Sequence, residues 1–313
     1  MTRSDATDAL SALKPGWRVL GGSHIGASHS STGAPCQDSH GWLADTDLVV
    51  LAVADGAGSR PHSHLGSRAA VESVLTWASE SKDPSGLLAD AFTTAREAVE
   101  LAATEAGLTT AELATTLAVA VISSEVVTIC QIGDSIPILR DAAGTHHVCR
   151  APRHEYANEV VFLTAPNALE NIQKEVLDSA VEMVSLSTDG LRYKILDVAS
   201  GDPYSPFYDD LFAYAKAEDS TSEGIERFLG RVDDQTGDDK TLVVAVHDEA
   251  HRIIEPHRHV GPKDRQQVVA SQSHDEAVAS SDGFENRQDG SAQTPADQRG
   301  HPSDDTGEEV ESN

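Results

Sequence analysis

The chain has few cysteines, few aromatic residues and few basic residues for its length. Its 313 residues include three cysteines, 4% aromatic residues, and 23 Lys and Arg against 51 Asp and Glu. Because Cys36, Cys130 and Cys149 are odd in number and lack CxxC spacing, the sequence favours a reducing compartment over a disulfide framework or a cysteine zinc site. A body this acidic is a poor binder of nucleic acid, whose phosphates are held through Lys and Arg.

Long apolar runs are also absent. No stretch approaches the run of about 20 apolar residues that crosses a bilayer. The segment at residues 1–5 lacks the apolar core of a signal peptide. We therefore expect a cytoplasmic protein that contacts neither membrane nor nucleic acid.

Changes in composition divide the chain into three parts. We expect residues 1–15, which are short and polar, to be a flexible leader, and residues 16–250 to form one domain. Residues 251–313 are rich in Gln, Ser, Asp, Gly and His. Such a segment buries too little apolar surface to offset its ordering entropy, so we expect an acidic, disordered tail.

The central part alternates strand and helix patterns. Apolar residues at helical spacing predict helices over residues 71–78 and 88–102. Residues 116–139 predict three strands, broken at 123–125 and 133–135. Because a parallel crossover needs a dozen or more residues, both breaks predict antiparallel hairpins.

Three further helical patterns and one strand complete this part. Helix pairs set against an antiparallel meander predict an α+β layered sandwich rather than a doubly wound sheet. The added helices and the last strand are expected at residues 191–198, 207–216, 222–229 and 241–246.

Four strand-like apolar runs each meet an aspartate where the strand should end or begin. Three runs lead into Asp55, Asp134 and Asp189, and a fourth follows Asp238. A single Asp-Gly pair is a common turn and predicts little. Four carboxylates that converged at strand ends would form an oxygen-rich site suited to Mg²⁺ or Mn²⁺. The pattern therefore indicates a metal-dependent hydrolase.

Six short blocks of sequence occur in a fixed order. Together they resemble the signature blocks of the PPM (type 2C) protein serine/threonine phosphatases, in the compact form of the bacterial branch, over residues 21–246. The resemblance implies an α+β fold, a four-layer α-β-β-α sandwich of two antiparallel sheets flanked by helices, with metals in a cleft at one end. The blocks are Pro35-Cys36-Gln37-Asp38, Val53-Ala54-Asp55-Gly56-Ala57-Gly58-Ser59, Ala114-Thr115-Thr116, Ile132-Gly133-Asp134-Ser135, Ser187-Thr188-Asp189-Gly190-Leu191 and Asp238-Asp239-Lys240-Thr241.

The resemblance also implies a role for each matching acid. Asp55 matches the acid that bridges two metal ions, and the carbonyl of Gly56 matches a ligand of the second ion. Asp189 and Asp238 match terminal carboxylates on the first ion. The implied catalytic residues are therefore Asp55, Asp189 and Asp238.

Two more acids complete the implied metal site. Asp38 matches an acid that holds metal-bound water, and Asp134 matches one that helps Asp189 to hold a third, weaker ion. The implied cofactors are two Mn²⁺ or Mg²⁺ ions with this third ion. The implied reaction is direct attack on phosphorus by a water that bridges the two ions, without a covalent enzyme intermediate.

Two positions depart from the family pattern. Many members place a phosphate-binding arginine five residues before the acid at Asp38, and this chain has Gly33 there. Many eukaryotic members place a histidine after the Asp-Gly pair, where this chain has Ala57. Arg60 is a nearby substitute for the arginine, and His62 with its neighbour His64 for the histidine, although solvated loop residues are the commoner role for all three.

Two further features bear on the charge around the expected site, namely Asp239 and the segment 143–169. Asp239 adds a second charge beside Asp238, which raises the pKa of one partner unless a cation is bound. The segment 143–169 corresponds to a variable flap, and its basic residues suit either a phosphopeptide contact or a chance run on an exposed loop. Those residues are His146, His147, Arg150, Arg153 and His154.

The leading hypothesis is a metal-dependent phosphatase that acts on phosphoserine or phosphothreonine in proteins. Its expected partners are the phosphorylated substrate and a cognate serine/threonine kinase in bacterial signalling. One alternative is a catalytically weak domain that serves as a binding or regulatory module, which the glycine at Gly33 favours. The other is a phosphatase of a small phosphorylated metabolite.

Overall fold

The computed structural model describes the central part of the chain. The expected leader and most of the expected tail lie outside the described residues. The described ranges are 16–45, 48–81, 88–124, 126–149, 160–177, 180–233, 235–248 and 257–261.

The described strands form two antiparallel sheets. Neighbouring strands are antiparallel in every pair of both sheets, as an α+β sandwich requires. The five-stranded sheet has the order β1 (Gly16–His24), β10 (Lys240–Asp248), β9 (Val181–Ser187), β6 (Ile136–Asp141) and β7 (His146–Val148). The six-stranded sheet has the order β11 (His257–Val260), β2 (Ser39–Ala44), β3 (Leu48–Ala54), β4 (Leu117–Ser123), β5 (Val127–Ile132) and β8 (Gln173–Leu177).

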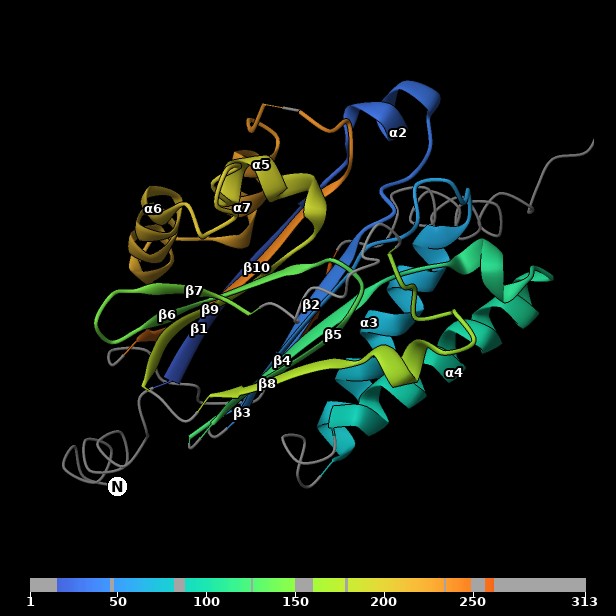
Figure 1. Ribbon diagram of the computed structural model, residues 1–313, viewed down its shortest axis with the longest axis horizontal. Coiled ribbons are helices and arrows are strands. Elements are labelled where there is room, and N and C mark those ends of the chain that lie inside the picture. The colour runs from blue at the N-terminus through green and yellow to red at the C-terminus, as the bar shows by residue number, and fades with distance from the viewer. Residues whose placement is uncertain are drawn as a thin grey trace, which may run out of the picture. The chain divides into compact units, whose positions relative to one another are not determined.

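Helices cover the outer face of each sheet (Figure 1). Two long helices, α3 (Ser63–Glu80) and α4 (Leu88–Ala106), lie over the six-stranded sheet. The five-stranded sheet is covered by α5 (Arg192–Ile195), α6 (Ser205–Lys216) and α7 (Ser222–Leu229). The predicted four-layer sandwich is confirmed. Shorter elements are α2 (Ala27–Thr32), η1 (Thr110–Leu113), η2 (Ala168–Asn171) and η3 (Asp189–Leu191).

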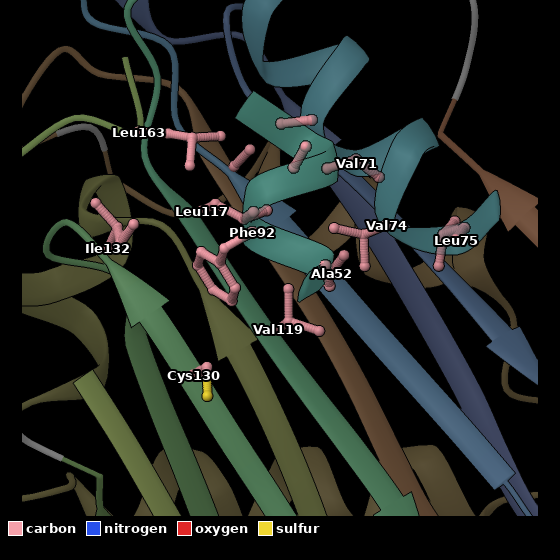
Figure 2. Close-up of a cluster of buried hydrophobic side chains, with 14 of the residues drawn as sticks. Ala52, Val71, Val74, Leu75, Phe92, Leu117, Val119, Cys130, Ile132 and Leu163 are labelled. Carbon is pink, nitrogen blue, oxygen red and sulfur yellow. The ribbon is translucent and has the colours of Figure 1, made fainter. Parts of the chain in front are cut away.

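Three layers of buried apolar side chains hold the four layers together. The first lies between α3, α4 and the six-stranded sheet, where Leu75, Phe92 and Leu117 are fully buried (Figure 2). A second fills the space between the two sheets, and a third lies under α5, α6 and α7. Each fully buried Leu or Phe contributes about 1.5–3 kcal/mol relative to exposure, so these layers supply most of the drive for the sandwich. No described helix has the length and apolar character needed to cross a membrane.

The connection between β5 and β6 is not the predicted hairpin. β4 and β5 do pair, with Leu117 opposite Ile132, but β6 pairs with β9 and β7 in the other sheet. The chain therefore crosses between sheets at Gly133, Asp134 and Ser135. Gly133 has a φ of 114° and lies close to Thr116, so the crossing uses a backbone conformation that glycine tolerates best.

The last described strand lies in the range expected to be tail. β11 pairs with β2 in antiparallel register, and the ring of His259 stacks on that of Trp42 with centroids 4.1 Å apart. The folded unit thus includes at least one strand beyond residue 250, the expected domain boundary. Residues 249–256 and 262–313 lie outside the described ranges.

Gly66 allows a close contact between α3 and η1. A Cβ built on Gly66 would lie 2.0 Å from the carbonyl oxygen of Leu113. Replacing glycine by alanine in an open helix gains about 1 kcal/mol, but Gly66→Ala is expected to lose about 1–3 kcal/mol by overpacking. Urea unfolding should show this loss, with the partly exposed Ser73→Ala on the same helix as a control. A gain in stability for Gly66→Ala would contradict the contact.

Candidate active site

The predicted acids gather at one end of both sheets. In the six-stranded sheet, Ser39 at the start of β2 pairs with Ala54 at the end of β3. Asp38, which precedes β2, and Asp55, which follows β3, are therefore neighbours at the same end.

The other three acids reach this end from the second sheet. Asp189 follows β9 and Asp238 lies two residues before β10, and these strands pair with Leu242 opposite Ser187. Asp134 lies in the crossing from β5 to β6, which joins the two sheets at this end. The structure thus brings together five acids that are far apart in sequence.

Two threonines fix the backbone of Asp55. Its carbonyl oxygen accepts hydrogen bonds from the amide of Thr116 at 2.8 Å and the hydroxyl of Thr115 at 3.0 Å. Its own amide donates to the hydroxyl of Thr116 at 3.0 Å. The Ala114-Thr115-Thr116 block therefore acts as a support that sets the position of the acid.

Gly56 lies where two loops touch. Its amide donates to the carbonyl of Gln37 at 3.2 Å. A Cβ on Gly56 would lie 2.7 Å from that carbonyl and 2.8 Å from the hydroxyl of Ser63, which leaves no room for a side chain. The absence of a side chain brings the Asp55 loop against the segment that leads into Asp38.

Asp38 is buried and held from the opposite sheet. The hydroxyl of Thr188 donates to its carboxylate at 2.7 Å and accepts the amide of Thr241 at 3.1 Å. Burial raises the pKa of Asp38 well above its usual range, and the charges of Asp239 and Asp238 raise it further. One hydrogen bond therefore ties the site across both sheets.

Asp55 is the electrostatic centre of the cluster. Burial is the main cause that raises its pKa well above the usual range, and the charges of Asp38, Asp189, Asp238 and Asp134 all add to the rise. The other four acids of the cluster therefore all act on Asp55.

Asp189 and Asp134 respond to one another and to a cation. Burial, then the charges of Asp134 and Asp238, raise the pKa of Asp189 to about 6. Burial also raises the pKa of Asp134. The guanidinium of Arg192 opposes both shifts. Carboxylates at this density carry a large electrostatic cost that a bound cation would offset.

The comparisons with known proteins agree with this arrangement. The sequence profile described as protein phosphatase 2C matches residues 25–230, about two thirds of the chain. The chain belongs to the protein phosphatase 2C family. It is 30% identical over 249 residues to serine/threonine-protein phosphatase 3 of Escherichia coli (strain K12). The aligned region covers 74% of this chain and 98% of that protein.

Solved structures of bacterial phosphatases share the fold. The S. agalactiae serine/threonine phosphatase matches with a TM-score of 0.54 and 16% identity, over 74% of this chain and 100% of that one. A serine/threonine phosphatase from Staphylococcus aureus matches with a TM-score of 0.52 and 14% identity, over 74% and 94% of the two chains. Enzymes of the protein phosphatase 2C family are metal-dependent, and this chain is a protein phosphatase.

The donor set of this protein phosphatase suits a hard cation. Within the described residues, no three His, Cys, Asp or Glu side chains form a group that could hold a metal ion as they stand. The chemistry nevertheless fits, because the five acids offer only oxygen donors, and like charges add to the raised pKa of Asp38, Asp55 and Asp189. A divalent cation among them would reverse those shifts, and no sulfur or imidazole competes in that set.

Asp239 has a structural role in the phosphatase in addition to the charge expected from the sequence. Its buried carboxylate accepts hydrogen bonds from the amides of Gly26 at 2.7 Å and Gln37 at 2.5 Å and from the Nδ1 of His29 at 3.0 Å. It therefore holds both ends of the segment that leads into Asp38. Sequence reasoning missed this anchor because His29 is far from Asp239 along the chain and has no motif around it.

Among the described contacts, none links Arg60 or His62 to the aspartates of the phosphatase. Gly33 ends α2 with a φ of 72°, and the charges of His62 and Arg60 act on the exposed Glu112 of η1. Burial raises the pKa of Cys36 well above its usual range, and Asp38 adds to the rise, so its thiol stays protonated. The thiol also interacts with the carboxylate of Asp239, which raises its pKa further and so does not activate it.

The basic residues of the flap are only partly described. His146 and His147 lie on β7, where His147 contacts Asp141 at 2.9 Å and His146 lies 3.8 Å from Asp209. His147 therefore has an acidic partner within the protein, whereas the buried Nε2 of His146 makes no hydrogen bond within the described residues. Arg150, Arg153 and His154 fall outside the described residues.

Proposed function

We propose that this protein phosphatase hydrolyses phosphoserine and phosphothreonine in proteins. The observation that supports it best is the central position of Asp55, whose pKa is raised by burial and by all four other acids. Asp55 and the carbonyl of Gly56 would hold two Mn²⁺ or Mg²⁺ ions, with Asp55 as the central ligand. Asp189 and Asp238 would supply the further carboxylate ligands.

The two remaining acids complete the proposed site. Asp38, held by Thr188, would accept a hydrogen bond from a water on the metal ions and keep that water oriented. Asp134 would help Asp189 to hold a third, weaker ion. The ions, when bound, supply an activated water and neutralise charge on the phosphoryl oxygens. Natural partners would be a phosphorylated protein and a cognate serine/threonine kinase in the cytoplasm.

Metal dependence is the first expected result. Purified protein should release phosphate from a phosphothreonine peptide with Mn²⁺, and EDTA should lower the rate by at least about a hundredfold, since metal-bound water and charge neutralisation are each worth several kcal/mol. Excess Mn²⁺ should restore it. A malachite green assay on phosphothreonine and phosphoserine peptides measures both effects.

The same assay separates the two alternatives. Mn²⁺ binding by calorimetry without turnover on any substrate would favour a binding or regulatory module. Faster turnover of a sugar phosphate than of either peptide would favour a metabolite phosphatase. Phosphate release that persists unchanged in EDTA would contradict the metal-dependent mechanism.

A further inference from the structure

Arg192 lies at the rim of the aspartate cluster. It is the first residue of α5 and follows directly after Asp189, Gly190 and Leu191 of η3. Its Nη2 lies 4.0 Å from Oδ2 of Asp134, and its side chain is 44% exposed. Within the described residues this long ion pair is the only side-chain contact of its guanidinium, so most of its five N–H donors face solvent.

An anionic substrate must approach a cluster of five carboxylates. A phosphate monoester adds about two more negative charges, so a cation of the protein at the rim of the cluster would favour its binding. The charge of Arg192 reaches the site, because its guanidinium lies beside Asp134 and its backbone follows Asp189 by three residues.

Arg60, the substitute suggested by the sequence, has its described charge interaction with a different acid. The charge of Arg60 acts, with that of His62, on Glu112 of η1. Arg192, by contrast, lies beside two of the acids that are proposed to bind metal. A guanidinium also binds phosphate through two parallel hydrogen bonds, which an ammonium group does not reproduce.

We propose that Arg192 binds the phosphoryl group of the substrate and fills the place of the arginine absent at Gly33. The inference rests on the proposed function, since it assigns a substrate contact to the same site. Arg192 leaves its long contact with Asp134 and donates to the phosphoryl oxygens when the substrate arrives. The exposed guanidinium has the freedom that this movement requires.

The test compares Arg192→Ala and Arg192→Lys with Arg60→Ala as the matched control. Arg192→Ala should raise the KM for a phosphothreonine peptide and the Ki of inorganic phosphate together, by about tenfold to a hundredfold, with a smaller change in kcat. Arg192→Lys should recover part of the loss, because it keeps the charge but not the paired donors. Arg60→Ala should stay within twofold of wild type.

A second readout does not depend on turnover. Calorimetric binding of inorganic phosphate to the Mg²⁺-loaded protein should weaken in Arg192→Ala, while the Kd for Mg²⁺ alone changes less than twofold. A purely structural arginine gives the opposite pattern: Mg²⁺ affinity or Tm changes and phosphate binding does not, which overturns the inference. An equal loss in Arg60→Ala also overturns it. Wild-type protein that binds phosphate through Arg192 but never turns over peptide overturns the proposed function instead.

Discussion

Asp55→Asn is expected to lower phosphate release by about a thousandfold, the largest effect of any single substitution on activity. Asp55 is the acid on which the other four all act, so its loss removes the shared ligand of the proposed ions. Several kcal/mol of transition-state stabilisation by the ions correspond to a factor of about a thousand in rate. The rate of peptide hydrolysis with saturating Mn²⁺ measures this loss of activity. Turnover within tenfold of wild type would contradict the assignment.

The same substitution is expected to stabilise the protein when no metal is bound. Because burial and like charges raise the folded-state pKa of Asp55 and raise that of Asp189 from 3.8 to about 6, the folded state holds protons more tightly than the unfolded state. Metal-free wild type should therefore lose stability as pH rises from about 4 through 6. Asp55→Asn removes part of this cost at neutral pH.

Thermal unfolding in EDTA at neutral pH tests whether Asp55→Asn stabilises the metal-free protein. Asp55→Asn should raise Tm by a few degrees, since about 1 kcal/mol moves the Tm of a domain this size by about 2–4 °C. The exposed Asp210→Asn on α6 makes the same charge change away from the cluster and should leave Tm nearly unchanged. With Mn²⁺ the order should reverse, because wild type gains more from the bound ions. A lower Tm for Asp55→Asn in EDTA would mean that its carboxylate has a stabilising partner.

The regular elements could be predicted because their signals are local. The helical spacing of Val71, Val74, Leu75 and Ala78 is the buried stripe of α3, and the apolar runs before the aspartates became strands. The crossing at Gly133 could not be predicted, because a gap of three residues permits either a hairpin or a change of sheet. Pairing between β6 and β9 places β6 in the other sheet, and these two strands are too far apart in sequence for a local pattern to predict their contact.

The site residues also divide into those that local sequence predicts and those that it does not. The aspartates stand in short motifs at strand ends, where sequence alone indicates carboxylates. Arg192 and His29 lie outside these motifs, and their partners Asp134 and Asp239 come from distant parts of the chain. Pairing of β6 with β9 and of β1 with β10 within the five-stranded sheet brings them together. The strand β11 also escaped prediction, because its two histidines and arginine resemble the polar residues around them, and pairing with β2 orders it.

Asp239→Ala is expected to cause the largest loss of stability, about 2–5 kcal/mol. Its carboxylate satisfies two buried amides, those of Gly26 and Gln37, and an orphaned buried donor costs about 1–3 kcal/mol. His29→Ala removes only the third contact and should cost about 1 kcal/mol. Urea unfolding of both variants, and of the double variant, measures the difference.

The loss should extend to metal binding, because the anchor lies between two proposed ligands. The amide of Asp239 donates to Oδ1 of Asp238 at 2.9 Å, and Gln37 leads directly into Asp38. Supports of this kind change metal affinity by about 10–100-fold when removed. Asp239→Asn keeps one acceptor but turns an amide group toward a backbone donor, so its stability should fall between wild type and Asp239→Ala. The assignment would be wrong if Asp239→Ala were as stable as His29→Ala and bound Mn²⁺ as tightly as wild type. The amides of Gly26 and Gln37 would then have other partners, and Asp239 would be only a charge beside the site.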